Sequence, residues 1–347
     1  VGGINRDIFT MGARPVAQLN SLRFGKLDEP RTKWLLSGVV KGIGDYGNAF
    51  GIPTVGGEVY FDESYHSNCL VNAMSVGLVR NDGIISAKAK GPGNPVFIVG
   101  SATGKDGIKG ASFASKDITE ESASDLPSVQ VGDPFQEKLL LEATMELAQT
   151  DAIVGMQDMG AAGITCSTSE MSAGGGVGMD IHLDLVPTRQ QGMQPFEILL
   201  SESQERMVLA VPVETLSSFL DACKLEDVEA TVIGDFTNSG RLVLRWHGEV
   251  QADLDLHFLH EGTPKPVRKA RFDAPRHTDP GVPAAKDQRA TLLAMLASTD
   301  IASKEWIVRQ YDHEVQGQSV LKPMTGVHRD APSDASVIKP LAQSIKG

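Results

Sequence analysis

Apolar residues recur every three or four positions in several stretches of the chain, and this spacing predicts helices with one buried face. The clearest case covers residues 32–50. A helix start or a tight turn is expected at residues 8–13, limited by Pro15. Further helices are expected at residues 164–173, 216–225, 292–296 and 306–311.

Short apolar runs bounded by polar or glycine-rich residues predict strands. The runs cover residues 70–79, 95–100, 152–158, 179–185, 208–211, 228–236 and 242–246. Strands and helices are mixed between residues 95 and 246, which predicts an α/β or α+β core.

A further helix is expected to start just after Gln130. Asp133 would cap this helix, with Pro134 at its first position and Gln136 completing a capping-box-like pattern. Because the helix itself has a structural role, Gln130 is the residue of interest for binding.

The chain of 347 residues is long enough for two domains, and glycine and proline clusters indicate where they divide. The turn at residues 91–95 separates a domain of residues 1–92 from one of residues 93–262. Residues 263–286 are rich in proline and charge, as linkers are. Residues 263–347 are therefore expected to form a linker and the start of a further part.

Charge and cysteine content narrow the functional classes. The net charge of −12 argues against a nucleic-acid-binding face. No apolar run approaches the ~20 residues that a membrane span requires, and no signal peptide is visible. The three cysteines are far apart, which disfavours disulfides and a zinc site and favours a cytoplasmic setting. Because the chain starts at Val1 rather than methionine, a fragment of a longer polypeptide is expected.

Acidic residues that follow apolar runs or glycines are candidates for ligand binding. Asp158 ends an apolar run and precedes small residues; such a carboxylate repels a phosphate but can hold a metal ion that binds one. The alternative is a helix cap. Arg6 and Asp7 could contact an anionic ligand and a metal ion, respectively, or form an ordinary surface ion pair. Glu58, after two glycines, could orient a ligand or be a turn residue.

A glycine-rich segment, residues 101–112, follows a predicted strand and could bind an anion through its backbone amides. Its candidate contacts are Gly104, Lys105 and Gly107. The spacing fits neither a Walker A loop nor Gly-x-Gly-x-x-Gly, so a plain flexible loop is the alternative.

A polar cluster, residues 201–207, lies between two apolar segments. Its carboxylate, hydroxyl and amide groups, from Glu202, Ser203 and Gln204, could hydrogen-bond a polyhydroxylated or amide-bearing ligand. The alternative is the C-terminus of a helix.

Several of these segments resemble, in the same order, the phosphoribosylformylglycinamidine synthase family, most closely its small, stand-alone synthetase subunit. They are residues 6–15, 53–59, 130–135, 157–163 and 201–207. The resemblance covers nearly the whole chain and places it in the aminoimidazole ribonucleotide synthetase superfamily. It implies a partial N-terminal synthetase domain with barrel-forming strands and flanking helices, followed by a C-terminal α/β domain.

The resemblance implies that ATP phosphorylates the amide oxygen of formylglycinamide ribonucleotide and that ammonia then displaces the phosphate. A partner glutaminase would supply the ammonia, and a small accessory subunit would complete the assembly. The implied substrate contacts are Arg6, Gln130, Glu202, Ser203 and Gln204. Asp7 and Asp158 would hold Mg²⁺, while Glu58, Gly104, Lys105 and Gly107 stay possible ligand contacts.

The resemblance also implies what this chain lacks. The catalytic histidine of the family would lie upstream of Val1, so none of the eight histidines takes that role and the chain alone should be inactive. Residues 311–317 resemble the connector to a second half, with which the chain would form a pseudo-dimer, or a homodimer as a fragment. The alternatives are an aminoimidazole ribonucleotide synthetase-like cyclo-ligase and a non-catalytic nucleotide-binding module.

Overall fold

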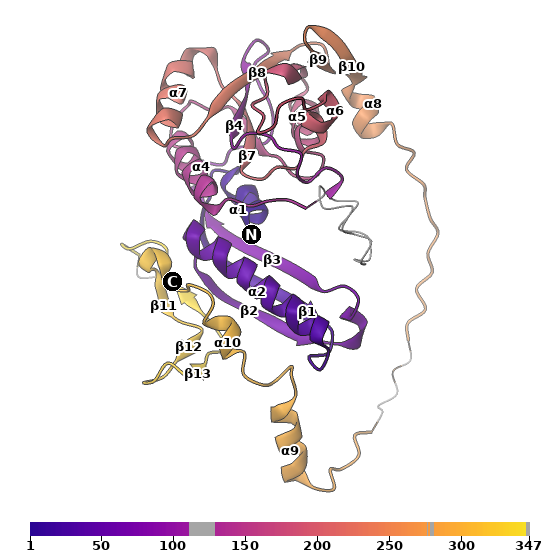
Figure 1. The fold of residues 1–347 in the computed structure, drawn as a ribbon, viewed down its shortest axis with the longest axis vertical. Coiled ribbons are helices and arrows are strands. Elements are labelled where there is room, and N and C mark those ends of the chain that lie inside the picture. Colours follow the sequence, from indigo (N-terminus) through magenta and orange to yellow (C-terminus); the bar gives the residue numbers. More distant parts are fainter. Residues whose placement is uncertain (111–128, 276, 278–280, 345–347) are drawn as a thin grey trace.

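The computed structural model describes residues 1–110, 129–275, 277 and 281–344. In these residues the chain builds two main sheets that follow one another along its long axis, with helices against each (Figure 1). An extended stretch then leads from the second sheet back to the first.

The smaller sheet comes from the N-terminal part of the chain. Its elements are α1 (Gly2–Phe9), β1 (Arg14–Phe24), α2 (Pro30–Phe50), β2 (Thr54–Phe61) and β3 (Leu70–Leu78). The strand order is β2-β1-β3, with β1 parallel to β2 and antiparallel to β3. Leu36, Val40 and Ile43 of α2 pack with Leu22 and Phe24 of β1. In the described residues this sheet is open, so the expected barrel is not closed here.

The larger sheet has the strand order β10-β9-β6-β8-β4-β7-β5. The strands are β4 (Pro95–Gly100), β5 (Gly155–Asp158), β6 (Gly178–His182), β7 (Arg206–Ala210), β8 (Ala230–Thr237), β9 (Arg241–Trp246) and β10 (Glu249–Asp255). The helices around it are α4 (Pro134–Leu147), α5 (Gly163–Gly175), α6 (Pro195–Leu200), α7 (Leu216–Leu225) and α8 (Leu256–Glu261). β6 and β9 run parallel and the other neighbours antiparallel, which makes the class α+β.

The central strands are buried on both faces, which explains why they read as continuous apolar runs. In β4, Val96 and Ile98 pack in a core with α5 and α6. Phe97 and Val99 point the other way, into a core with α4 and α7. The edge strand β5 carries Asp158 at its end, and α1 packs beside both β5 and α4. The two sheets therefore meet at α1.

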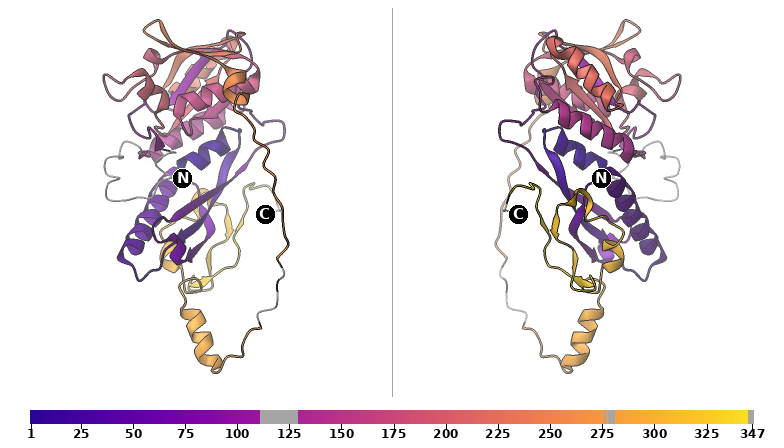
Figure 2. Two further views of the ribbon diagram at one scale, coloured as in Figure 1. Left: turned by 90° about the vertical axis from the view of Figure 1, so that its right-hand side faces the viewer. Right: turned by 90° about the vertical axis from the view of Figure 1, so that its left-hand side faces the viewer.

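The C-terminal segment returns to the smaller sheet. Residues 262–287 form no helix or strand where they are described, as expected of a linker. The elements that follow are α9 (Gln288–Ala297), α10 (Glu305–Val308), β11 (Ser319–Leu321), β12 (Met324–Thr325), β13 (Ala331–Pro332) and β14 (Val337–Ile338). This segment lies against the smaller sheet (Figure 2), and the N–H of Thr54 in β2 donates to the carbonyl of Asp312 at 2.9 Å. No helix in the described residues is long and apolar enough to cross a membrane.

Most of the predicted elements are confirmed, with four corrections. The helix expected at residues 8–13 instead spans Gly2–Phe9, and β1 follows it unpredicted. Pro15 lies inside β1, at an irregularity in the pairing with β3 that suits a residue without an N–H. The strand expected at residues 179–185 ends at His182. The edge strand β10 was not predicted because most of its side chains are exposed and carry no apolar signal.

Candidate active site

A buried arginine on α1 joins the two sheets. Arg6 is 1% exposed, and its Nη1 donates to Oε2 of Glu137 on α4 at 3.0 Å. Its Nη2 donates to Oε1 of Gln204, just before β7. Glu137 is fully buried within the helix face that otherwise carries leucines. The alternative of an ordinary surface ion pair between Arg6 and Asp7 is therefore excluded, because Arg6 is buried and bonds to Glu137 and Gln204 instead.

A second buried carboxylate lies close to the same guanidinium. Glu205 accepts from Oη of Tyr46 at 2.8 Å and from the N–H of Asp133 at 3.1 Å. That second contact corrects the predicted capping box, since Glu205 rather than Gln136 satisfies this N–H. Burial raises the pKa of Glu137 to about 7 and also raises the pKa of Glu205, in both cases against the opposing effect of Arg6. Two carboxylates thus share one guanidinium.

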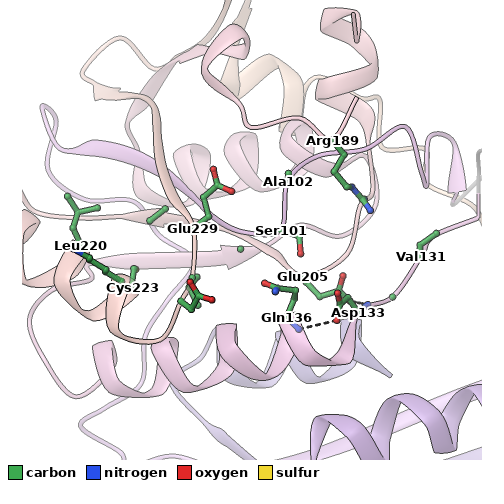
Figure 3. Close-up of a pocket in the computed structure, with 16 residues that line it drawn as sticks. Ser101, Ala102, Val131, Asp133, Gln136, Arg189, Glu205, Leu220, Cys223 and Glu229 are labelled. Atoms are coloured by element: carbon green, nitrogen blue, oxygen red, sulfur yellow. Dashed lines mark hydrogen bonds between the residues drawn. The ribbon is translucent and has the colours of Figure 1, made fainter. Parts of the chain in front are cut away.

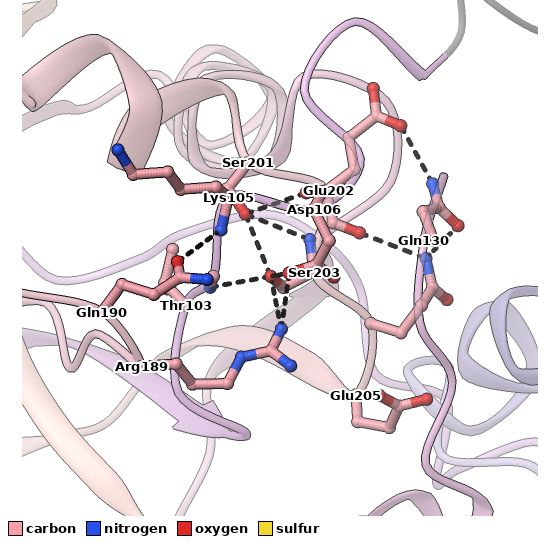
Figure 4. Close-up of polar contacts among 12 residues, drawn as sticks. Thr103, Lys105, Asp106, Gln130, Arg189, Gln190, Ser201, Glu202, Ser203 and Glu205 are labelled. Carbon is pink, nitrogen blue, oxygen red and sulfur yellow. Dashed lines mark hydrogen bonds and ion pairs between the residues drawn. The ribbon is translucent and has the colours of Figure 1, made fainter. Parts of the chain in front are cut away.

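Four of the predicted substrate-binding residues form one hydrogen-bonded chain, which we call the amide relay. It runs from Arg6 through Gln204 and Gln130 to Glu202. Nε2 of Gln130 donates to Oε2 of Glu202 at 2.9 Å (Figure 4). Oε1 of Glu202 accepts from the N–H of Ala162, the residue before α5, at 3.1 Å. Residues from distant parts of the sequence therefore meet where the resemblance places a ligand.

The two predicted metal ligands also meet. Asp158 ends β5, and its carboxyl group lies beside that of Asp7 on α1, close enough for each group to affect the pKa of the other. Burial, together with the Asp7 charge, raises the pKa of Asp158 to about 6, and burial raises the pKa of Asp7. The helix-cap alternative is excluded, because Ala162 is the N-cap of α5 and no side chain caps it.

The paired carboxylates fit a magnesium ion. Two carboxyl groups held side by side repel each other when both are ionised, which raises their pKa values. A bound cation reduces this repulsion. Mg²⁺ commonly takes one or two carboxylates and completes its shell with water and phosphate oxygens. In the described residues no three His, Cys, Asp or Glu side chains gather into a metal site. Within the part of the chain that the structure describes, a closed, all-protein metal site is therefore not built, and the Asp7–Asp158 pair is an arrangement that fits an ion shared with water and phosphate.

The glycine-rich loop supports the polar cluster from the side. The N–H of Gly104 donates to Oγ of Ser203, and the N–H of Lys105 donates to Oε1 of Gln190, both at 2.9 Å. Gly107 has φ +75°, and a Cβ there would lie 2.5 Å from Cβ of Glu202. These two amides already donate to the protein, so an open phosphate cradle is not formed by them. Residues 111–112 of this predicted loop lie outside the described residues.

Arg206, at the start of β7, holds the polar cluster from beneath and was missed by sequence reasoning. It is fully buried, and its guanidinium donates to neutral oxygens only: the carbonyls of Ser203 and Ser201 at 2.8 and 2.7 Å and Oγ1 of Thr103 at 2.7 Å. Burial lowers its pKa to about 9. Asp106 accepts from Ser203 Oγ at 2.7 Å on the other side. The backbone of residues 201–203 is therefore fixed by side chains on both sides.

A cleft of about 740 Å³ is lined by Ser101, Gln136, Arg189, Glu205 and Glu229, among others (Figure 3). None of the individually predicted site residues lines it. Ser101 nevertheless belongs to the glycine-rich segment 101–112 that the sequence marked as a candidate anion-binding segment. The wall formed by the segment between α7 and β8 was not anticipated.

Glu58 is not brought to the site. It lies in the middle of β2, exposed, with an ion pair to Arg23 and a hydrogen bond from Ser21 at 2.9 Å. Among the described residues no histidine hydrogen-bonds to the Asp7–Asp158 pair or to the amide relay.

Two family models match the chain. The N-terminal domain of AIR synthase related proteins matches residues 1–79, and the C-terminal domain matches residues 91–247. Among curated proteins, the phosphoribosylformylglycinamidine synthase subunit PurL of Anaeromyxobacter dehalogenans is 53% identical, over 93% of this chain and 43% of its own length. The chain thus spans less than half of that relative.

Three solved structures from Thermotoga maritima are also similar. PurL complexed with FGAR has a TM-score of 0.73 and 36% identity, over 93% of this chain and 49% of that one. The structure of PurLQS has a TM-score of 0.73 and 32% identity, over 95% and 50%. PurL complexed with ATP has a TM-score of 0.68 and 33% identity, over 85% and 46%. With both domain models matched in order, this chain belongs to the AIR synthase related family, and the relatives that it resembles over part of their length are PurL subunits.

Proposed function

We propose that this chain supplies the ribonucleotide- and magnesium-binding part of an ATP-dependent phosphoribosylformylglycinamidine synthase. The observation that carries the proposal is the side-by-side arrangement of the amide relay and the Asp7–Asp158 pair at the meeting of the two sheets. The FGAR and ATP complexes of the relatives support the choice of substrate and nucleotide.

In the proposed reaction the amide oxygen of formylglycinamide ribonucleotide takes the γ-phosphoryl group of ATP, and ADP leaves. Ammonia then attacks the amide carbon that bears the phosphorylated oxygen. Phosphate departs from that carbon, which gives the amidine. An amide oxygen is a poor leaving group until it is phosphorylated, so ATP is consumed in every turnover. When bound, Mg²⁺ neutralises the phosphate charge that develops during transfer.

The residues of this chain have distinct tasks in that scheme. Arg6, Gln204, Gln130 and Glu202 orient the ribonucleotide, with Ser203 beneath them. Asp7 and Asp158 would hold the metal ion. The ion would offset the repulsion between these carboxylates and the phosphates of ATP. The proton-transfer histidine is not supplied by this chain.

An ammonia-dependent assay tests the proposal. The full-length enzyme that contains this chain is expected to release phosphate from ATP only when formylglycinamide ribonucleotide and ammonia are both present. The 347-residue chain by itself is expected to show no turnover. Phosphate release with the amidine product as sole co-substrate would support a cyclo-ligase instead. Nucleotide binding without any release would support a non-catalytic module.

The partner proposals rest on an exposed apolar sheet face. Leu70, Met74 and Leu78 lie at every fourth position of β3 and therefore on the same face of the strand. Their side chains are 43%, 56% and 40% exposed. We propose that this face pairs with a second synthetase half, or with a second copy when the chain is alone. The PurLQS relative supports a larger assembly, which we propose contains a glutaminase and a small accessory subunit.

Met74→Lys tests the paired face. The unaltered chain is expected to elute as a dimer in size-exclusion chromatography with light scattering, and Met74→Lys as a monomer, because a lysine in an apolar contact leaves a buried charge. Trp34→Lys is the control, since Trp34 is 72% exposed on the outer side of α2. A dimer that survives Met74→Lys but not Trp34→Lys would place the contact elsewhere.

A further inference from the structure

We propose that Glu137 is a positioning residue of this site: by holding Arg6 it fixes the donor and acceptor direction of the amide relay. The ligand it serves, formylglycinamide ribonucleotide, rests on the proposed function. The claim about the relay rests on the contacts of this chain alone.

The two ends of the relay determine its direction. Arg6 can only donate hydrogen bonds, and both carboxylate oxygens of Glu202 accept them, one from Gln130 and one from the N–H of Ala162. Each glutamine between them offers one amide oxygen and one amide nitrogen. Oε1 of Gln204 must therefore face Arg6, its Nε2 must face Gln130, and Nε2 of Gln130 must face Glu202, as the contacts show. A flipped Gln204 would set its nitrogen against a guanidinium, and a ligand would meet the opposite pattern of groups.

Arg6 itself is held by few contacts. Its Nη1 bonds to Glu137 and its Nη2 to Gln204, while its buried Nε has no hydrogen-bond partner among the described residues. The Glu137 contact is single, because Oε1 of Glu137 likewise finds no partner in the described part of the chain. Loss of this one contact therefore frees the guanidinium to turn about its side chain.

Glu205 is the carboxylate to which a freed Arg6 would turn. It interacts with Arg6 through charge but is hydrogen-bonded to Tyr46 and Asp133 instead. An Arg6 drawn towards Glu205 would leave Oε1 of Gln204 without its donor, and the glutamines could then flip. Because Glu205 still balances the Arg6 charge, removing the Glu137 charge should not unfold the chain.

Glu137→Gln tests the proposal, with Glu142→Gln as the matched control. Glu142 lies on the same helix and forms its own two-bond ion pair to Arg14, at 3.0 and 2.7 Å, away from the relay. The first readout is the side-chain amide NMR signals of Gln130 and Gln204 in the ¹⁵N-labelled chain without ligand, assigned by their loss in Gln130→Ala and Gln204→Ala. Glu137→Gln is expected to move both sets, and Glu142→Gln neither.

The second readout is the affinity for formylglycinamide ribonucleotide, measured by calorimetry. Glu137→Gln is expected to weaken binding roughly 10- to 100-fold, the effect of losing a charge-assisted hydrogen bond. Glu137→Asp should weaken binding as Glu137→Gln does. Its side chain keeps the charge but is one methylene shorter, so its carboxylate cannot reach Arg6. Unmoved amide signals in a folded variant overturn the proposal, and so does loss of the fold in both variants. The amide signals could move while the unaltered chain fails to bind the ribonucleotide. That result would support the role of Glu137 in the relay and overturn the proposed function.

Discussion

Asp158→Asn is expected to lower magnesium-dependent amidine formation by the full-length enzyme at least about 100-fold, because the metal ion proposed to neutralise the reacting phosphates would lose one of its two carboxylate ligands. The same change is expected to stabilise the metal-free chain near pH 7.5. Asp158 lies against Asp7 in a buried position, and its pKa is raised to about 6. A raised carboxyl pKa means that folding favours the protonated form, so stability is lost as pH rises from about 4 to about 6.

Two measurements check this prediction. Turnover is followed against magnesium concentration, and urea unfolding is followed in EDTA at pH 4 and pH 7.5. From pH 4 to pH 7.5, the urea midpoint of the wild-type chain should decrease more than that of Asp158→Asn. Added magnesium should raise the urea midpoint of the wild-type chain only. Asp151→Asn, an exposed change before the same strand, is the control. Equal magnesium responses in wild type and Asp158→Asn would refute the metal site.

Arg206→Met is expected to lower the free energy of unfolding by about 3 kcal/mol. The methionine would leave the buried carbonyls of Ser201 and Ser203 and the hydroxyl of Thr103 without their donor, and each unsatisfied group costs about 1–3 kcal/mol. Relief from burying the charge offsets part of this cost.

Urea denaturation with Arg241→Met as control measures the effect. Arg241 forms an exposed ion pair with Asp253, so its loss should cost less than about 1 kcal/mol. The prediction also has a functional side, since the loosened residues 201–203 carry Glu202 and support Gln204. If Arg206→Met proved as stable as Arg241→Met, water would have to replace the hydrogen-bond donors of Arg206, and the prediction would be wrong.

The sequence predicted elements whose apolar spacing is strong, such as α2 and α7. It also gathered Arg6, Gln130, Glu202 and Gln204 as one site, through the family resemblance rather than through spacing. It did not predict β1, because that strand buries the polar side chains of Gln18 and Asn20 and so breaks the apolar alternation.

The charged residues behind the site could not be predicted from local pattern. Glu137 occupies a helix position that any charged residue could take on a solvent face, and its burial depends on Arg6, 131 residues away. Arg206 reads as the polar start of a strand, and only the folded chain shows its carbonyl partners. Burial of a charge is a property of its distant neighbours, which a single sequence does not display.

The return of the C-terminal segment to β2 has a consequence for biosynthesis. β2 is an edge strand, and an uncovered edge can pair with other chains and aggregate. Here its Thr54 and Phe61 amides are covered by Asp312 and Asp300, which the ribosome adds some 240 to 260 residues later. The nascent chain therefore carries an uncovered strand edge until Asp300 and Asp312 have been added, and its demand for chaperones should fall once these residues emerge.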